Sequence, residues 1–381
     1  MNINQNEDEY YSSLLLKSTI DDLNDEFLNK SISFGSIHSS SQNQSIQNND
    51  NKTTKNNYNS QKNSNIRLNN IPFLSKMDIK YLSPSYQFTL NEIDSILQKL
   101  KGHFFQLMTG KNSNYFISNI IINATKKQKL IILSEIYPQI DTLSISEYGS
   151  HPLQNLIEKA SSKDEIIMII NAITAKNKFI EIAKDVNGTY VIQKIISYFN
   201  ENFRTKVNQI ILNNIVELCN DMFGVCVIKK FINNCQNQEC IYFLLVTFIN
   251  NFVNISENQF GNYAIQIFID KIALNEKMLS VLEQQIFLNF LRLSVHRFGS
   301  RVIENYIEKL RKKKKRKILS ILWDKGYIFQ LIINKYGKYV ISKLLYGFNS
   351  ENRKNLLNAF SSIKNNNEFN LNEHSLINFD L

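Results

Sequence analysis

The stretch FGSRVIENYIEKL, residues 298–310, has the apolar spacing of an amphipathic helix that begins just after a glycine. Its apolar residues recur at intervals of three and four, which places them on one face of a helix. A serine, an arginine and a glutamate stand near the start of the same helix, at positions 300, 301 and 304. One copy does not explain this polar group, so the other glycines of the chain become informative.

Six of the eleven glycines follow one another at intervals of 39, 36, 37, 38 and 38 residues. The segments that they open are alike, and each is called here a recognition word. They read GSHPLQNLI at Gly149, GTYVIQKII at Gly188, GVCVIKKFI at Gly224, GNYAIQIFI at Gly261, GSRVIENYI at Gly299 and GKYVISKLL at Gly337. A seventh copy, SNYFISNII at Ser113, keeps the register with serine in place of glycine, 36 residues before Gly149. This regular period predicts a helical solenoid.

Each unit has the same predicted anatomy. A short apolar helix such as FLRLSVH, residues 290–296, precedes the word, the word opens a second helix, and a third amphipathic helix follows. A unit of this size cannot bury its own apolar face, so stacked units must share a continuous core. With only four prolines and 43% apolar residues, the composition fits an all-α fold better than a turn-rich β fold.

Three positions of the word vary in chemical type between copies. Position 1 is the residue after the glycine, and position 5 lies one helical turn later, so their side chains are neighbours. Position 2 lies beside them, whereas positions 3, 4, 7 and 8 are almost always apolar. A purely structural solenoid does not need varied polar groups at fixed places, so we expect these positions to contact a ligand.

The words resemble those of the Pumilio (PUF) family of RNA-binding repeats. LSVHRFGSRVIE and ENQFGNYAIQ are similar to the seventh and sixth repeats of that family, and LMTGKNSNYFIS is similar to its second. The resemblance covers about residues 89–365. It implies a curved right-handed α-solenoid of seven to eight three-helix repeats. On its concave face each repeat would meet one unstacked RNA base, with two side chains on the base edge and a third stacking.

The resemblance implies two well-kept readers: Asn262, Tyr263 and Gln266 for uracil, and Ser300, Arg301 and Glu304 for guanine. The two amides supply a donor and an acceptor to the uracil edge, and the glutamate accepts from the two N–H groups of guanine. The tyrosine ring and the guanidinium plane would stack on bases, a contact worth about 1–3 kcal/mol per base.

The other words match the family's pattern less completely. Ser150, His151 and Gln154 resemble an adenine reader, and Thr189, Tyr190 and Gln193 an adenine or tolerant reader. Asn114, Tyr115 and Ser118 resemble a weakened uracil reader, since a serine replaces the usual glutamine. Two words depart from the pattern: Val225, Cys226 and Lys229, and Lys338, Tyr339 and Ser342. With RNA antiparallel to the protein, as in the family, the expected target is 5′-(U)-G-U-x-x-A-(U)-3′.

These inferences predict a monomeric regulator that binds single-stranded RNA in mRNA 3′ untranslated regions. In this family such binding represses translation or promotes decay through protein effectors, which would dock on the convex face or the N-terminal tail. We expect a cytoplasmic protein, with a nuclear or nucleolar location as the alternative. Two other functions stay open: ribosomal RNA processing, as in nucleolar relatives, and a protein-binding scaffold of the HEAT or armadillo kind.

Composition bounds these choices. The net charge of +10 favours polyanionic partners. The most apolar stretch, residues 241–255, is broken by Asn250 and Asn251 and is shorter than a membrane span of about 20 residues. No spacing suggests an enzyme or a cofactor, and the four cysteines, which lack a C-x-x-C pair, are expected to be reduced thiols without a metal.

The expected domain organisation is a mostly disordered Asn/Ser-rich tail, residues 1–75, followed by the RNA-binding domain, residues 76–381, with a degenerate or missing first repeat. The basic run RKKKKRK, residues 311–317, has three interpretations: contact with RNA phosphates, a nuclear localisation signal, or a solvated helix start.

Overall fold

The computed structural model describes residues 86–324 and 326–346, and the predicted tail, residues 1–75, lies outside them. The described residues form helices without a single strand, which confirms the all-α class. Among the described helices, none combines the length and apolarity needed to cross a membrane.

The helices repeat in sets of three, as the sequence predicts. The recognition helices, which carry the words, are α4 (Ser113–Asn123), α7 (Ser150–Lys159), α10 (Gly188–Tyr198), α13 (Gly224–Asn234), α16 (Gly261–Ile272), α19 (Gly299–Lys309) and α22 (Gly337–Leu345). The short helices before them are α3 (Phe104–Thr109), α6 (Ile140–Ile145), α9 (Phe179–Ala183), α12 (Ile215–Cys219), α15 (Phe252–Glu257), α18 (Phe290–Ser294) and α21 (Tyr327–Ile333). The outer helices are α2 (Leu90–Leu100), α5 (Lys126–Ile136), α8 (Lys163–Ala175), α11 (Thr205–Asn213), α14 (Gln238–Asn250), α17 (Glu276–Leu288) and α20 (Lys312–Asp324), and a 3-10 turn, η4 (Tyr137–Gln139), links α5 to α6.

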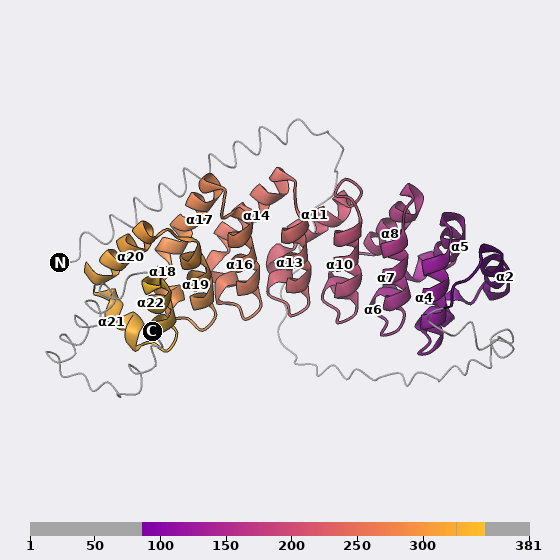
Figure 1. The fold of residues 1–381 in the computed structure, drawn as a ribbon, viewed down its shortest axis with the longest axis horizontal. Helices are drawn as coiled ribbons and strands as arrows, with labels where there is room; N and C mark the ends of the chain where they lie inside the picture. Colours follow the sequence, from indigo (N-terminus) through magenta and orange to yellow (C-terminus); the bar gives the residue numbers. More distant parts are fainter. Residues whose placement is uncertain (1–85, 325, 347–381) are drawn as a thin grey trace, which may run out of the picture. The chain divides into compact units, whose positions relative to one another are not determined.

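Helices of the same kind pack against one another in successive units. Each recognition helix, from α4 to α22, contacts the next one, and the outer helices from α5 to α17 form a second row. Figure 1 shows the recognition helices side by side in chain order. Positions 3, 4, 7 and 8 of the words point into the core between the rows; in α19, Val302, Ile303, Tyr306 and Ile307 are fully buried. The structure thus confirms the solenoid with one continuous core.

The periodic glycine is required by a close approach to the short helix. A β-carbon at Gly188 would lie 2.2 Å from the carbonyl oxygen of Ile182, six residues earlier, which is far inside van der Waals contact. The serine of the first word solves the same problem differently, because the Ser113 hydroxyl donates to the carbonyl of Leu107 at 2.7 Å. Glycine or a hydrogen-bonding serine therefore lets each recognition helix start against its short helix.

A polar side chain three residues before each glycine fixes the start of the recognition helix by accepting from the glycine N–H. These acceptors are Ser146, Asp185, Asp221, Asn258, His296 and Asn334. The histidine accepts through Nδ1 at 3.2 Å, so it caps the helix start. Such capping satisfies N–H groups that a helix leaves unpaired.

The described part of a first unit consists of α2, which packs against α5 as an outer helix does. A capping box starts it: the Thr89 N–H donates to Glu92 at 2.8 Å, and the Glu92 N–H donates to the Thr89 hydroxyl at 3.3 Å. No recognition word precedes it in the described residues, and the predicted first repeat otherwise lies outside them.

Candidate nucleic-acid interface

The position 2 side chains form a row across the recognition helices, one per unit. The tyrosines of this row are strongly exposed: Tyr115 at 68%, Tyr190 at 57%, Tyr263 at 42% and Tyr339 at 54%. His151 and Arg301 are exposed as well, and Cys226 is half-buried. Large aromatic side chains usually bury their area, so four exposed rings at one periodic position indicate a contact surface.

Position 1 is placed differently from the sequence expectation, which put it on the surface beside positions 2 and 5. In six of the seven words this side chain is buried: Asn114, Ser150, Thr189, Val225, Asn262 and Ser300. The seventh, Lys338, is half-buried. The physical reason is that the first helical turn packs against its own loop and the next unit. The Thr189 hydroxyl, for example, donates to the Phe223 carbonyl at 3.1 Å.

Position 1 and position 5 nevertheless lie together, as one helical turn requires. The Gln266 amide donates to Asn262 Oδ1 at 3.0 Å, and the Gln193 amide donates to the Thr189 hydroxyl at 3.1 Å. Position 5 is half-buried in most words, namely at Ser118, Gln154, Gln193, Lys229, Gln266 and Glu304, and exposed at Ser342. In each pair the position 5 side chain is therefore the more accessible member.

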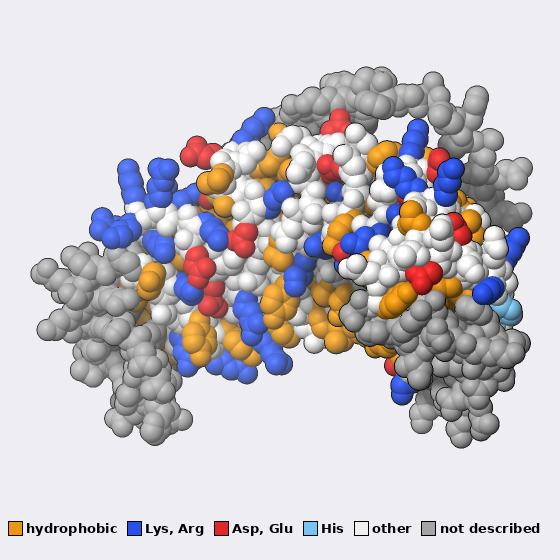
Figure 2. All heavy atoms as spheres, turned by 45° about the vertical axis from the view of Figure 1, so that its right-hand side comes forward, with side chains coloured by type: hydrophobic (Ala, Val, Ile, Leu, Met, Phe, Trp, Pro, Cys, Tyr) orange, Lys and Arg blue, Asp and Glu red, His pale blue; other side chains and the backbone are white. Residues whose placement is uncertain are grey.

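Cationic side chains contact the rings of the row. Arg301 Nη1 donates to the Tyr263 hydroxyl at 3.0 Å, which joins position 2 of two neighbouring units. Lys229 Nζ lies 5.8 Å from the centre of the same ring, and Lys338 Nζ lies 5.3 Å from the ring of Tyr339. Alternating rings and positive charges suit a strand whose bases stack and whose phosphates are anionic. Figure 2 shows hydrophobic and basic side chains interleaved along the lower edge of the face in view.

Glu304 is the position 5 residue of the word at Gly299, for which the sequence predicts a guanine reader. Burial raises the pKa of its carboxyl, while the positive charges of Lys343 and Arg301 act in the opposite direction. A carboxylate at this position is an acceptor that is partly removed from water. Such an acceptor gains more from a matching pair of N–H donors than an exposed carboxylate does.

Inter-unit ion pairs are a feature that the sequence reading missed. Lys194 pairs with Glu158 and Lys343 with Glu308, each across neighbouring recognition helices, and Lys309 Nζ lies 2.7 Å from Asp270. The hydrogen bond from Lys194 holds the pKa of Glu158 below its usual range. The partners of the first two pairs are 36 and 35 residues apart, close to one repeat period. Opposite charges one period apart in the sequence could therefore have predicted these ion pairs.

The basic run, residues 311–317, lies at the start of α20 in the outer row. Lys315 is buried, and Lys314 pairs with Glu283, which also accepts from the Tyr306 hydroxyl at 2.8 Å. Part of the run thus serves packing of the outer helix, and α20 is a different element from the recognition helices.

Comparison with known proteins agrees with this architecture. The Pumilio-family RNA binding repeat matches residues 103–137, 139–174, 178–207, 214–244, 251–278 and 289–322. The chain is 29% identical over 195 residues to Suppressor protein MPT5 of Saccharomyces cerevisiae and 25% identical over 258 residues to Pumilio homolog 12 of Arabidopsis thaliana. These alignments cover 50% and 67% of this chain, but only 23% and 42% of the two relatives.

Solved structures show the same fold. The Puf4 RNA binding domain bound to the HO endonuclease RNA 3′ UTR recognition sequence superposes with a TM-score of 0.65 at 24% identity, over 72% of this chain and 86% of that one. The RNA-binding domain of yeast Puf5p bound to AAT2 RNA gives a TM-score of 0.58 at 26% identity, over 71% and 79% of the two chains.

Proposed function

Because the chain belongs to the Pumilio family of RNA-binding repeat proteins, which are not enzymes, we propose that it reads single-stranded RNA with one base per unit. The proposed target is a UGU-type element, about 5′-(U)GUxxA(U)-3′, in mRNA 3′ untranslated regions. The chain would then act as a cytoplasmic post-transcriptional regulator that represses translation or promotes decay by recruiting protein effectors.

The observation that carries this proposal is the row of exposed position 2 side chains. Four tyrosines, a histidine and an arginine share one periodic place, and the recognition helices that bear them pack side by side. Bases inserted between successive members of the row would bury apolar area on both faces. A protein-binding scaffold has no reason to expose one stacking group in nearly every unit.

The guanine and uracil assignments rest on the position 5 groups. Glu304 offers a partly desolvated acceptor whose ionised form is favoured by the positive charges of Lys343 and Arg301. Gln266 offers an amide that is already oriented by Asn262. Asn262 is fully buried and accepts from Gln266, so its direct contact with a base edge requires the side chains around it to move.

The relatives support RNA as the kind of ligand, but they do not support a particular base sequence of the target. The Puf4 domain carries a 3′ UTR recognition sequence, and the Puf5p domain carries AAT2 RNA. The two words that depart from the family's pattern, at Val225 and Lys338, leave two positions of the element unassigned.

The test is binding of the full chain to short RNAs that differ only in a UGU, ACU or UUU core, at one salt concentration. We expect a preference for UGU of about tenfold or more, because an unmatched polar edge costs about 1–3 kcal/mol. Glu304→Gln should reduce the preference for guanine, since an amide presents a donor where the carboxylate only accepts. Glu308→Gln removes the same charge from the exposed side of α19 and should leave the preference unchanged.

Three outcomes would contradict parts of the proposal. Equal binding of all three RNAs would favour ribosomal RNA processing or another nonspecific role. No RNA binding at all would favour a protein-binding scaffold. An undiminished guanine preference in Glu304→Gln would show that the base assignment of the word at Gly299 is wrong.

A further inference from the structure

Two of the four cysteines meet a carboxylate from the preceding unit. The ligand atoms of Glu201, Cys235 and Cys240 all lie within 4.8 Å of one another. All four cysteines are free thiols, and Cys235 is buried while Cys240 is half-buried. Glu201 lies in the turn between α10 and α11, and the cysteines flank the turn between α13 and α14. The cluster therefore joins the same turn of two consecutive units.

A buried guanidinium beside the cluster is only partly hydrogen-bonded within the described residues. Arg204 is only 2% exposed, and one of its nitrogens, Nη2, donates to the Asn234 carbonyl at 3.1 Å. Its Nε and Nη1 are buried and have no hydrogen-bond partner among the described residues, and the same is true of Glu201 Oε1. A charge that has lost its water is stable only next to compensating charge, so this site favours anionic ligand groups.

We propose that Cys235, Cys240 and Glu201 bind a thiophilic divalent cation of the Zn²⁺ class, and that Arg204 balances the charge of the occupied site. Two thiolates, one carboxylate and a divalent ion sum to −1, and the guanidinium brings the buried site to neutrality. Thiolate ligands select zinc-like ions over Mg²⁺ or Ca²⁺. The two thiol protons leave to solvent as the ion binds.

The spacing of the groups is close to what such an ion needs. With Zn–S bonds of about 2.3 Å, two sulfurs of a tetrahedral site lie about 3.8 Å apart. Atoms that already lie within 4.8 Å of one another need to close by only about an ångström. A disulfide between the cysteines would require the sulfurs to approach to about 2.05 Å, a larger rearrangement.

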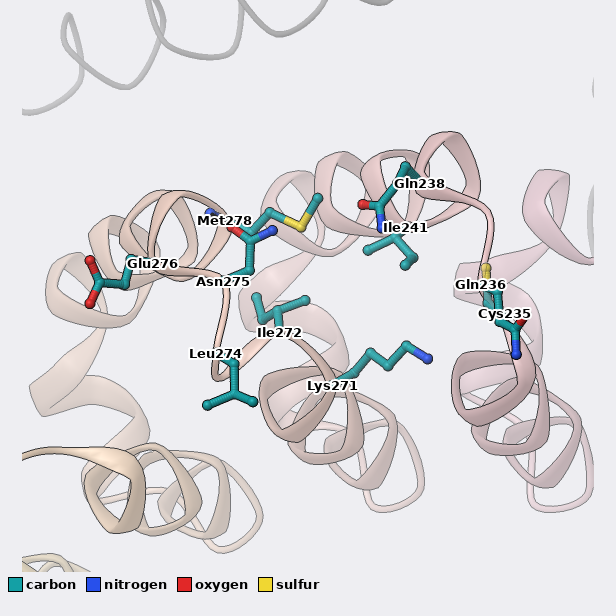
Figure 3. Close-up of a pocket in the computed structure, with 10 residues that line it drawn as sticks. All are labelled: Cys235, Gln236, Gln238, Ile241, Lys271, Ile272, Leu274, Asn275, Glu276 and Met278. Carbon is teal, nitrogen blue, oxygen red and sulfur yellow. Dashed lines mark hydrogen bonds between the residues drawn. The ribbon is translucent and has the colours of Figure 1, made fainter.

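Glu201 and Cys240 are half-buried and so remain partly accessible to solvent, whereas Cys235 is fully buried. Cys235 lines a surface pocket of about 620 Å³ between the α13–α14 turn and the α16–α17 turn. Figure 3 shows Cys235 on its side of this pocket, opposite Leu274 and Asn275 of the next unit. In the free thiol the Cys235 Sγ donates weakly to the Asn237 carbonyl at 3.7 Å, a contact that the ion would replace. Once bound, the ion would fix the α10 and α13 units relative to each other.

The experiment is a titration of the full, untagged chain with Co²⁺ and then Zn²⁺ under a thiol-free reductant, followed by native mass spectrometry. We expect one ion per chain, thiolate-to-cobalt charge-transfer absorption, and displacement of Co²⁺ by Zn²⁺. Cys240→Ser and Glu201→Gln should each weaken binding by more than the roughly 10–100-fold that loss of an outer-shell group costs.

Matched controls separate ligand loss from other effects. Glu239→Gln removes a carboxylate charge from the exposed side of α14, next to Cys240 but outside the cluster, and Cys226→Ser removes a thiol from the recognition helix of the same unit. Both should bind the ion as the unmodified chain does. Absence of the charge-transfer band, equal metal binding by Cys240→Ser, or a mass two hydrogens lighter without metal, which marks a disulfide, would each overturn the proposal.

Discussion

At the residue scale, Asn262 and Gln266 lie in different surroundings, although the sequence analysis expected both to contact the base edge. The Asn262 amide donates to the carbonyls of Asn258 and Gln259 at 2.9 and 3.0 Å, so it holds the loop before the helix. Gln266 donates to it and stays accessible. We expect Asn262→Ala to lower the free energy of unfolding by about 1–3 kcal/mol and also weaken RNA binding, because it removes buried hydrogen bonds.

Gln266→Ala is the matched comparison, measured by urea unfolding and by binding to an RNA with a uracil facing this unit. It should weaken binding of that RNA while it changes the free energy of unfolding by no more than about 0.5 kcal/mol, as half-exposed substitutions usually do. A Gln266→Ala protein as destabilised as Asn262→Ala would refute this division of tasks.

Glu304 gives guanine recognition a predicted pH dependence. Burial raises the pKa of its carboxyl above the ordinary value of 4.5, so protonation begins at a higher pH than for an exposed glutamate. Only the ionised form accepts from both guanine N–H groups. Affinity for the guanine-containing RNA should therefore fall as the pH is lowered from 7 to 5. The affinity of Glu304→Gln measured over the same range should not show this component, and parallel curves would contradict the role of the carboxylate.

At the element scale, the start of each recognition helix depends on the residue that faces the short helix. Gly188→Ala would place a β-carbon 2.2 Å from the Ile182 carbonyl oxygen, so the backbone must shift. We expect a loss of about 1–3 kcal/mol in the free energy of unfolding. Ser113→Gly should cost less, about 1 kcal/mol, because it loses one hydrogen bond, to the Leu107 carbonyl, without a clash. Ser197→Ala, on the exposed side of α10, is the control for both in chemical denaturation.

The outer helices α5 and α8 are joined by a buried ion pair. Lys129 Nζ lies 3.0 Å from Glu165, and the two side chains are 5% and 0% exposed. Burial opposes ionisation of Glu165, but hydrogen bonds from the Ser161 N–H, from the Ser162 hydroxyl and N–H and from Lys129 hold its pKa below the usual value of 4.5. Glu165→Gln keeps a side chain that can cap the helix but leaves the buried Lys129 charge without an anionic partner. It should therefore lower the free energy of unfolding by about 3–5 kcal/mol.

The sign of the pH effect follows from the lowered pKa of Glu165. The carboxylate contributes stability above about pH 4.5, and the contribution is lost as the pH falls through the lower folded-state pKa. Below pH 4.5, the free energy of unfolding of the unmodified chain should therefore fall more steeply with decreasing pH than that of Glu165→Gln. Identical slopes would mean that the pair contributes nothing to folding.

The repeat period was sufficient to predict the elements, because spacing of apolar residues fixes helix faces and the glycine fixes each helix start. It did not predict the burial of position 1. Asn262 and Thr189 read as surface amide and hydroxyl groups in the sequence, and only the neighbouring loop and unit bury them. The sequence did not predict the cluster of Glu201 with the two cysteines for a similar reason. Its carboxylate comes from another unit, 34 residues before Cys235 in the chain.

At the scale of the whole molecule, the net charge of +10 raises the question of where the RNA backbone is neutralised. The densest basic run belongs to α20 in the outer row, whereas Lys229 approaches the ring of Tyr263 in the recognition row. We expect the phosphates to follow the recognition row. For single strands, each phosphate contact contributes about −0.7 to the slope of log affinity against log salt.

The prediction compares two sets of substitutions by measuring affinity for one UGU-containing RNA from low to high salt. Lys312→Gln with Lys313→Gln removes two exposed charges from α20 and should leave the slope unchanged, because that helix start is not in the recognition row. Lys229→Gln should reduce the magnitude of the salt slope by up to about 0.7, which corresponds to the loss of one phosphate contact. A slope reduced by about 1.4 in the α20 double variant would instead place the RNA backbone against the outer row and restore the phosphate interpretation of the basic run.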